Sequence, residues 1–203
     1  MPEIHLFLLA SALLTLAPGP DNLQVLARGI AEGRRAALAA ACGFASGVLF
    51  HTALAVAGIA LLIRSSPTLF AALKYAGAAY LAYLGVLALT RRETGPASRE
   101  TAATLARIYR QSVLGNLLNP KVSLFFIAFL PQFIRPSEGR IGLQMLLLGL
   151  LFMTQTLVIF GTIGWFAGSI GAWLQNSAGA GRKLNLIAAL VFFAIALRLA
   201  LPE

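Results

Sequence analysis

The sequence predicts an all-α, polytopic membrane protein with six transmembrane helices, arranged as two inverted three-helix repeats. Its first and fourth helices are broken at proline-containing motifs. Of the 203 residues, 59% are hydrophobic and only 11% are charged, whereas soluble domains average about 25% charged residues. Several uncharged runs approach the roughly 20 residues that a spanning helix needs. The composition therefore excludes an ordinary soluble domain.

Hydrophobic segments set the predicted helices, which together form one transmembrane domain, residues 1–203. The segments are Ile4–Leu26, Ala36–Ile63, Thr68–Leu89, Ser112–Ile134, Ile141–Trp165 and Leu184–Leu201. Prolines interrupt the first at Pro18 and Pro20 and the fourth at Pro120, where they break the helical hydrogen-bond ladder. Residues 168–181 fit either an extension of the fifth helix or a loop at the membrane interface.

An internal repeat relates the two halves of the chain. Glu32-Gly33-Arg34 recurs as Glu138-Gly139-Arg140, and Asp21 falls opposite Lys121 when the halves are aligned. Because each half holds three helices, the second must enter the membrane from the opposite face. Many secondary transporters have such inverted repeats, with their sites in interrupted helices at the repeat interface. The predicted parts are residues 1–90, a cytoplasmic connecting loop at 91–111, and residues 112–203.

Basic residues predict the orientation, because cytoplasmic loops carry an excess of Lys and Arg. Ten basic residues lie in the first, third and fifth loops, and five lie on the opposite side. The ten are Arg28, Arg34, Arg35, Arg91, Arg92, Arg99, Arg107, Arg110, Arg182 and Lys183; the five are Arg64, Lys74, Arg135, Arg140 and Arg198. We therefore expect a multi-pass protein of the bacterial inner membrane with both termini outside.

Charge and cysteine content narrow the partners and cofactors. The net charge of +9 comes from residues that flank hydrophobic segments, which indicates contact with membrane lipid and not with nucleic acid. The single cysteine, Cys42, excludes an intramolecular disulfide or a Cys-x-x-Cys site. We expect no cofactor and no bound metal. The first residues lack the basic region of a cleavable signal peptide, so we expect the first segment to be retained.

The first break, Ala17-Pro18-Gly19-Pro20-Asp21-Asn22, is a candidate functional site. Asp21 alone among the seven acidic residues lies within a hydrophobic segment. Ionisable residues at membrane depth are rare and mark ion or proton pathways. A carboxylate here can take up and release a proton during transport. A helix end capped by Asp21 and Asn22 is the simpler interpretation, and the two roles are compatible.

The second break places a basic residue at a matching position. Lys121 follows Asn119 and Pro120, a turn-forming pair, and is the only basic residue well inside a predicted span. An unpaired ammonium in lipid costs at least about 2.5 kcal/mol. We therefore predict that Lys121 and Asp21 approach each other, directly or through water. The alternative is that the Lys121 side chain extends to the membrane surface.

Other polar residues could complete a site around the two breaks. A zwitterionic ligand needs a cation or helix N-terminus for its carboxylate, and carbonyls or a carboxylate for its ammonium. Predicted substrate-binding or helix-break residues are Pro18, Gly19, Pro20, Asn22, Asn116, Asn119, Pro120 and Lys121. Candidate cavity-lining residues are Gln24, His51 and Gln155, the last flanked by Thr154 and Thr156. This chemistry suits a small amino acid.

Two features keep alternatives open. His51 could relay protons or hydrogen-bond a neighbouring helix. Gly43 and Gly47 form a small-xxx-small face that favours close helix packing, and such a face could also pair protomers in a homodimer.

The motifs resemble those of the LysE/RhtB family of amino-acid exporters over nearly the whole chain. The matching stretches are Leu16–Asn22, Gly33–Ala36, Asn119–Phe126 and Phe129–Phe133. The resemblance implies efflux of an amino acid from the bacterial cytoplasm, driven by the membrane ion gradient. It places the family motifs on Pro18, Gly19, Pro20, Asp21 and Asn22, and on Asn119, Pro120 and Lys121. Ala17 departs from the hydroxyl residue of many members, and the Asp-Asn pair resembles the homoserine/threonine branch, which implies a neutral substrate.

The sequence thus favours a secondary exporter that exchanges a small neutral amino acid for protons, with Asp21 as the proton-coupling residue. An exporter of a metal or other ion on the same scaffold is the alternative. It is disfavoured because only His5, His51 and Cys42 could act as soft ligands. An intramembrane enzyme would need catalytic groups that the chain mostly lacks.

Overall fold

The computed structural model describes residues 4–17, 19–59 and 103–176, with scattered positions from 68 to 90 and from 182 to 197. Every regular element within these residues is helical. The α-helices are α1 (Ile4–Leu16), α2 (Pro20–Ala31), α3 (Arg34–Leu54), α6 (Leu105–Leu117), α7 (Pro120–Leu124), α8 (Ile141–Trp165) and α9 (Ala167–Asn176). Short π-helical turns cover Ala55–Ile59 and Phe125–Phe129, and 3₁₀ turns cover Leu130–Phe133 and Pro136–Glu138.

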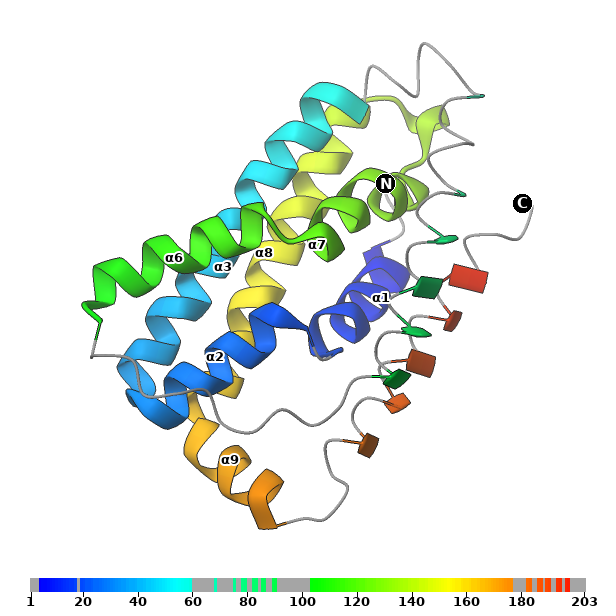
Figure 1. The fold of residues 1–203 in the computed structure, drawn as a ribbon. Coiled ribbons are helices and arrows are strands. Elements are labelled where there is room, and N and C mark those ends of the chain that lie inside the picture. Colours follow the sequence, from blue (N-terminus) through cyan, green and yellow to red (C-terminus); the bar gives the residue numbers. More distant parts are fainter. Residues whose placement is uncertain are drawn as a thin grey trace.

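Two long helices form the centre of the described part. α3 with its π-helical turn spans Arg34–Gly58, and α8 spans Ile141–Trp165; each is 25 residues long and apolar enough to cross a membrane. They pack side by side and run in opposite directions (Figure 1). α8 has the bounds predicted for the fifth segment. The second predicted segment, Ala36–Ile63, overlaps α3, and its last residues lie outside the described part.

Two bent pairs of helices complete the described spans. α1 and α2 meet at an angle of 57°, and α6 meets the α7 segment at 48°. If each bent pair is one span, four of the described elements are long and apolar enough to cross a membrane. Both breaks fall at the predicted prolines. A bent pair followed by a long helix therefore occurs twice, the order expected of a duplicated unit.

Several predictions fall on residues outside the described part. They include most of the third segment, Thr68–Leu89, most of the sixth segment, Leu184–Leu201, and residues 91–102 of the connecting loop. The six-span count, the inverted repeat and the division into residues 1–90 and 112–203 stay predictions.

The prediction of a connecting loop as far as residue 111 is wrong in its last part. α6 begins at Leu105, capped by the Thr104 side chain, which accepts a hydrogen bond from the Arg107 backbone N–H. Charged and polar residues made this stretch look like a loop. It is an amphipathic helix whose buried face carries Ile108, Ser112 and Asn116 at four-residue spacing.

The ambiguous stretch after the fifth segment is also resolved as far as residue 176. A turn at Phe166 ends α8, with the Phe166 N–H bonded to the Thr162 carbonyl. α9 then runs from Ala167 to Asn176 and packs against α2. This stretch is therefore a separate helix, and neither a continuation of α8 nor a loop.

α3 packs against α6 through two glycines. A Cβ atom on Gly43 would lie 2.4 Å from the Tyr109 carbonyl oxygen, and one on Gly47 would lie 2.7 Å from Asn116. This confirms close packing of the Gly43/Gly47 face, which α6 of the same chain occupies. The homodimer stays a prediction.

Two apolar clusters hold the spans together. One is aromatic and joins α1, the α7 segment and α8, with Phe7, Phe125, Phe133 and Phe152 at its centre. The other is rich in alanine and joins α2, α3, α6 and α8 around Phe44 and Phe160. Large apolar side chains also cover much of the outer surface, among them Leu114 and Val158, as expected of helices that face lipid.

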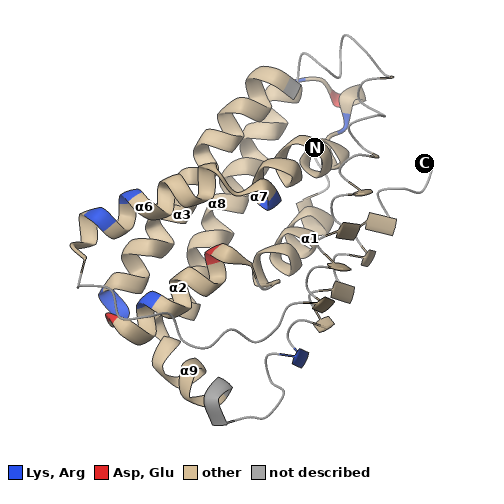
Figure 2. Cartoon of the chain, viewed as in Figure 1, with Lys and Arg blue, Asp and Glu red and all other residues tan. Residues whose placement is uncertain are grey.

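Charged residues gather at the ends of the helices (Figure 2). One cluster lies where α2 ends and α3 and α6 begin, and another lies before α8. In the middle of the view, red marks the start of α2, which contains Asp21, and blue marks the start of α7, which contains Lys121. Among the described residues, these two are the only buried Asp, Glu, Lys or Arg side chains.

Candidate functional site

The first break leaves backbone carbonyls of α1 without helical partners. Gly19 is extended (φ −149°, ψ 179°), and Pro20 begins α2. The Asn22 side-chain amide donates to the Thr15 carbonyl at 2.6 Å. The Lys121 ammonium, from the other half of the chain, donates to the Ala17 carbonyl at 3.0 Å. The Thr15 and Ala17 carbonyls are thus satisfied inside the protein, as a low-dielectric surrounding requires.

The second break is closed mainly by its own residues. Asn119 caps α7, because its Oδ1 accepts a hydrogen bond from the Lys121 backbone N–H at 3.0 Å, and Pro120 occupies the first helical position. The Asn116 carbonyl accepts from the Asn119 N–H at 3.0 Å and from His51 Nε2 at 3.1 Å. Since a carbonyl can only accept, Nε2 carries the hydrogen.

Asp21 accepts hydrogen bonds from two side-chain amides at the second break. Asn119 Nδ2 donates to Oδ1 at 2.7 Å, and Asn116 Nδ2 donates to Oδ2 at 3.2 Å. The Asp21 residue is 6% exposed. Hydrogen bonds from neutral donors to a charged acceptor are among the stronger ones in proteins. They stabilise a buried carboxylate.

Lys121 lies on the same cavity as Asp21 and is 8% exposed. Its ammonium would lie 3.3 Å from a Cβ atom at position 19, so the absence of a side chain at Gly19 leaves it room. The structure therefore brings the Asp21 and Lys121 side chains to one place, and the Lys121 side chain does not extend to the surface.

The cavity between the breaks is small and has two unlike sides. Its volume of about 20 Å³ holds about one water molecule, so a larger ligand requires the helices to separate. Polar lining residues are Thr15, Asp21, Asn22, Asn116, Asn119, Lys121 and Thr156; the others are Gly19 and the apolar Leu14, Val122, Phe152 and Phe160.

Most of the predicted site residues meet here. Gly19, Asp21, Asn22, Asn116, Asn119 and Lys121 all line the cavity. Pro20 and Pro120 are exposed and begin α2 and α7. Pro18 lies outside the described residues.

The three candidate cavity-lining residues do not line it. His51 hydrogen-bonds α6 instead and packs on Phe126, which favours the helix-bonding alternative for this residue. The Gln155 amide donates to Ser11 Oγ at 3.1 Å and so ties α8 to α1. Gln24 lies near Gly115 of α6.

Sequence reasoning missed the apolar side of the cavity. Phe152 and Phe160 lie four residues before and after Thr156, so all three share one face of α8. This spacing was visible in the sequence. In an almost uniformly apolar helix, however, nothing distinguishes a cavity face from a lipid face.

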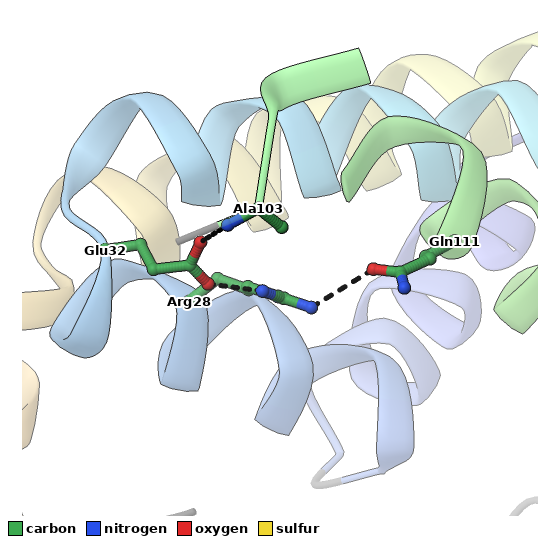
Figure 3. A network of polar contacts seen from close by, with 4 residues as sticks. All are labelled: Arg28, Glu32, Ala103 and Gln111. Carbon is green, nitrogen blue, oxygen red and sulfur yellow. Dashed lines mark hydrogen bonds and ion pairs between the residues drawn. The ribbon is translucent and has the colours of Figure 1, made fainter. Parts of the chain in front are cut away.

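A polar network ties α2 to α6 at the charged end of the molecule (Figure 3). Arg28 on α2 bonds Glu32 one turn later and donates to Gln111 Oε1 on α6 at 3.2 Å. Glu32 Oε2 accepts from the Ala103 N–H at 3.2 Å. The two halves of the chain are therefore joined both at the cavity and at this end.

In the described part of the chain, no group of three or more His, Cys, Asp or Glu side chains is placed to hold a metal ion.

Comparison with known proteins identifies the family. The model of the LysE type translocator family matches residues 12–203. The chain belongs to this family. The resemblance read from the two proline motifs is thereby confirmed.

Several relatives of this translocator carry efflux functions in their names. It is 34% identical over 200 residues to a leucine efflux protein of Salmonella typhimurium, covering 96% of this chain and 92% of the relative. It is 33% identical over 173 residues to a homoserine/homoserine lactone efflux protein of the same organism, covering 84% and 82%. An uncharacterized membrane protein of Pseudomonas aeruginosa is 34% identical over 180 residues. No solved structure matches the translocator.

Proposed function

We propose that this translocator is a secondary exporter that moves a small neutral amino acid out of the bacterial cytoplasm in exchange for protons. One observation carries the proposal: a buried carboxylate and a buried ammonium, each at a broken span, line the same cavity. Efflux proteins named for leucine and homoserine among its relatives support the amino-acid class.

The charges of the cavity favour a neutral substrate. Asp21 suits an α-ammonium group and Lys121 suits an α-carboxylate, so a zwitterion leaves no charge over. A substrate with a basic side chain would need a second carboxylate, and the cavity lining contains no other acidic residue.

Asp21 couples the substrate to the proton. As a carboxylate it accepts hydrogen bonds from both Asn116 and Asn119. Protonation turns one of its oxygens into a hydrogen-bond donor. That oxygen still faces the N–H of an amide, and it is now a poor acceptor for it. Loss of this bond weakens the contact between the two breaks, so proton binding favours separation of the helices and access to the cavity.

The charged end, with Arg28, Arg34, Arg35, Arg107 and Arg110, faces the cytoplasm in this proposal. Both chain ends then lie on the outer side of the inner membrane, opposite the cytoplasm. The substrate reaches the cavity from the charged end when the Arg28–Gln111 contact opens.

The experiment is amino-acid movement and internal pH in proteoliposomes that contain the purified protein. We expect an inward proton gradient to drive efflux of labelled leucine or homoserine from the vesicles and to acidify their interior. Asp21→Asn keeps the size and polarity of the side chain but cannot exchange a proton. It should lose gradient-driven efflux and acidification by about 100-fold. Efflux that ignores the pH gradient in the unaltered protein would contradict proton exchange.

A further inference from the structure

The wall of the cavity contributed by α8 differs from the wall at the two breaks. α8 presents Phe152, Thr156 and Phe160, which are 4%, 2% and 3% exposed. Asp21 and Lys121 lie at the breaks, which belong to the other helices. A zwitterion whose charged groups bind at the breaks therefore directs its side chain toward α8.

Thr156 is unusual among the threonines of α8. The hydroxyl groups of Thr154 and Thr162 donate to the backbone carbonyls four residues earlier, at 2.9 Å and 2.8 Å. Thr156 Oγ1 is buried and has no hydrogen-bond partner among the described residues. Buried hydroxyl groups nearly always have a partner, so an unpartnered one on a cavity is available to a water molecule or to a polar group of a ligand that displaces it.

A second unpartnered atom belongs to Asn116, a residue that also lines the cavity. Asn116 Oδ1 is buried without a hydrogen-bond partner in the described part of the chain, although Asn116 Nδ2 binds Asp21. Asn116 Oδ1 packs against Gly47 of α3, where a Cβ atom would lie 2.7 Å from it, so the Thr156 hydroxyl is the unpartnered group that we assign to the cavity. The Thr156 hydroxyl suits a polar group in the side chain of an amino acid.

The neighbours of Thr156 are held in place. The Phe160 ring packs edge-on against Phe44 of α3 at 5.7 Å between centroids, and the Phe152 ring lies 4.9 Å from Phe125. Thr156 therefore sits between two fixed aromatic rings. Such a wall can enclose a short carbon chain while its single hydroxyl bonds one polar atom.

We propose that Thr156 is a specificity-determining residue that binds a hydroxyl group in the side chain of the substrate, with Phe152 and Phe160 enclosing the carbon chain. This inference rests on the proposed export of a neutral amino acid. It assigns the site to hydroxyl-bearing amino acids in preference to aliphatic ones of the same size. A site built to bond a hydroxyl rejects an analogue without it strongly, because its own polar group is left unpaired.

The test is a selectivity ratio in proteoliposomes, measured with homoserine and norvaline, in which a methyl group replaces the hydroxyl. We expect the unaltered protein to favour homoserine by at least about tenfold. Thr156→Val, which replaces the hydroxyl by a methyl group, should lower that ratio by about tenfold or more, partly by faster norvaline movement. Thr156→Ser keeps the hydroxyl and should keep the preference.

Thr154→Val is the matched control. Thr154 lies on the same helix, but it is exposed and bonds its own backbone. The control should leave the ratio unchanged. Because a ratio does not depend on the amount of protein in the membrane, lower expression of a variant does not affect it. The preference of the unaltered protein tests the proposal even if Thr156→Val does not fold.

Equal movement of both amino acids by the unaltered protein would overturn the inference, as would a Thr156→Val ratio within about twofold of the original. Either result leaves amino-acid export standing. Vesicles in which the unaltered protein moves no amino acid under a proton gradient would overturn the proposed function, and this inference with it.

Discussion

The break between α1 and α2 and the break between α6 and α7 both restart at a proline, but they find their hydrogen-bond partners differently. At the first break, Lys121 from the other half supplies the partner of the Ala17 carbonyl. At the second, Asn119 caps the new helix from within its own segment. The second break also lends the amides of Asn116 and Asn119 to Asp21.

This difference indicates which break depends on the other. The first cannot keep its carboxylate and its free carbonyl satisfied unless the second lies against it. Any movement that separates the two breaks therefore changes the surroundings of Asp21. The comparison explains why a proton on Asp21 could control the movement, and substitutions at matched positions can test it.

The largest effect on folding is expected at Asn119, which serves both breaks. Asn119→Ala removes the cap of α7, worth about 1 kcal/mol, and a hydrogen bond to a buried carboxylate, worth about 1.5–3 kcal/mol. We expect the free energy of unfolding in mild detergent to fall by about 3 kcal/mol. Asn22→Ala, which removes only the bond to the Thr15 carbonyl, is the matched variant and should cost about 1 kcal/mol. Equal losses of unfolding free energy in the two variants would contradict the claim that the first break depends on the second.

The second-largest effect is expected at Gly47, which packs against Asn116. A methyl group at Gly47 would lie 2.7 Å from Asn116 Oδ1, so Gly47→Ala should displace Asn116 or separate α3 from α6. Overpacking of this kind costs about 1–3 kcal/mol. We expect a lower melting temperature and weaker proton-driven efflux. Gly58→Ala, where a Cβ atom meets nothing within 4 Å, should change neither; a matching loss there would show a general intolerance of alanine.

A smaller effect is expected at His51, which supports the second break from α3. His51→Leu removes its hydrogen bond to the Asn116 carbonyl, which keeps a second donor in the Asn119 N–H. The cost should be about 1 kcal/mol, and proton-driven efflux should persist because His51 does not line the cavity. Complete loss of coupling in a folded variant would show instead that His51 relays protons.

The smallest effect is expected at the charged end. Gln111→Ala removes one hydrogen bond from the partly exposed Arg28 side chain, while the contact of Arg28 with Glu32 remains. We expect the free energy of unfolding to fall by about 0.5–1 kcal/mol. Accessibility of a cysteine introduced at position 111 to a water-soluble thiol reagent would report opening of this end; a rise with the inward proton gradient is expected, and protection that ignores the gradient would contradict it.

Much of this arrangement could be predicted from the sequence because the relevant signals are local. Prolines mark both breaks, and charged residues in apolar segments are few enough that Asp21 and Lys121 had to find partners. The limits of α8 follow from the charged and turn residues that flank it. These signals depend on composition and spacing, which the sequence states directly.

The wrong predictions concern residues whose contacts depend on which way they point from the helix axis. Gln155 and Thr156 are neighbours in the sequence, yet adjacent residues of a helix point about 100° apart, so one bonds Ser11 and the other faces the cavity. The first turns of α6 were assigned to a loop because their exposed face carries Arg107 and Arg110. Only the packing of α6 on α3 distinguishes that amphipathic helix from a loop.

The most direct test of the account is a double-mutant cycle between the two breaks, with Asp21→Asn, Lys121→Gln and the double variant. Each is measured for the free energy of unfolding in detergent and for amino-acid exchange in vesicles. We predict that each single variant leaves a buried charge poorly compensated. The free energy of unfolding lost in the double variant should then be smaller than the sum of the two single losses, by at least about 1 kcal/mol. Additive losses would contradict the claim that Asp21 and Lys121 act on each other across the breaks.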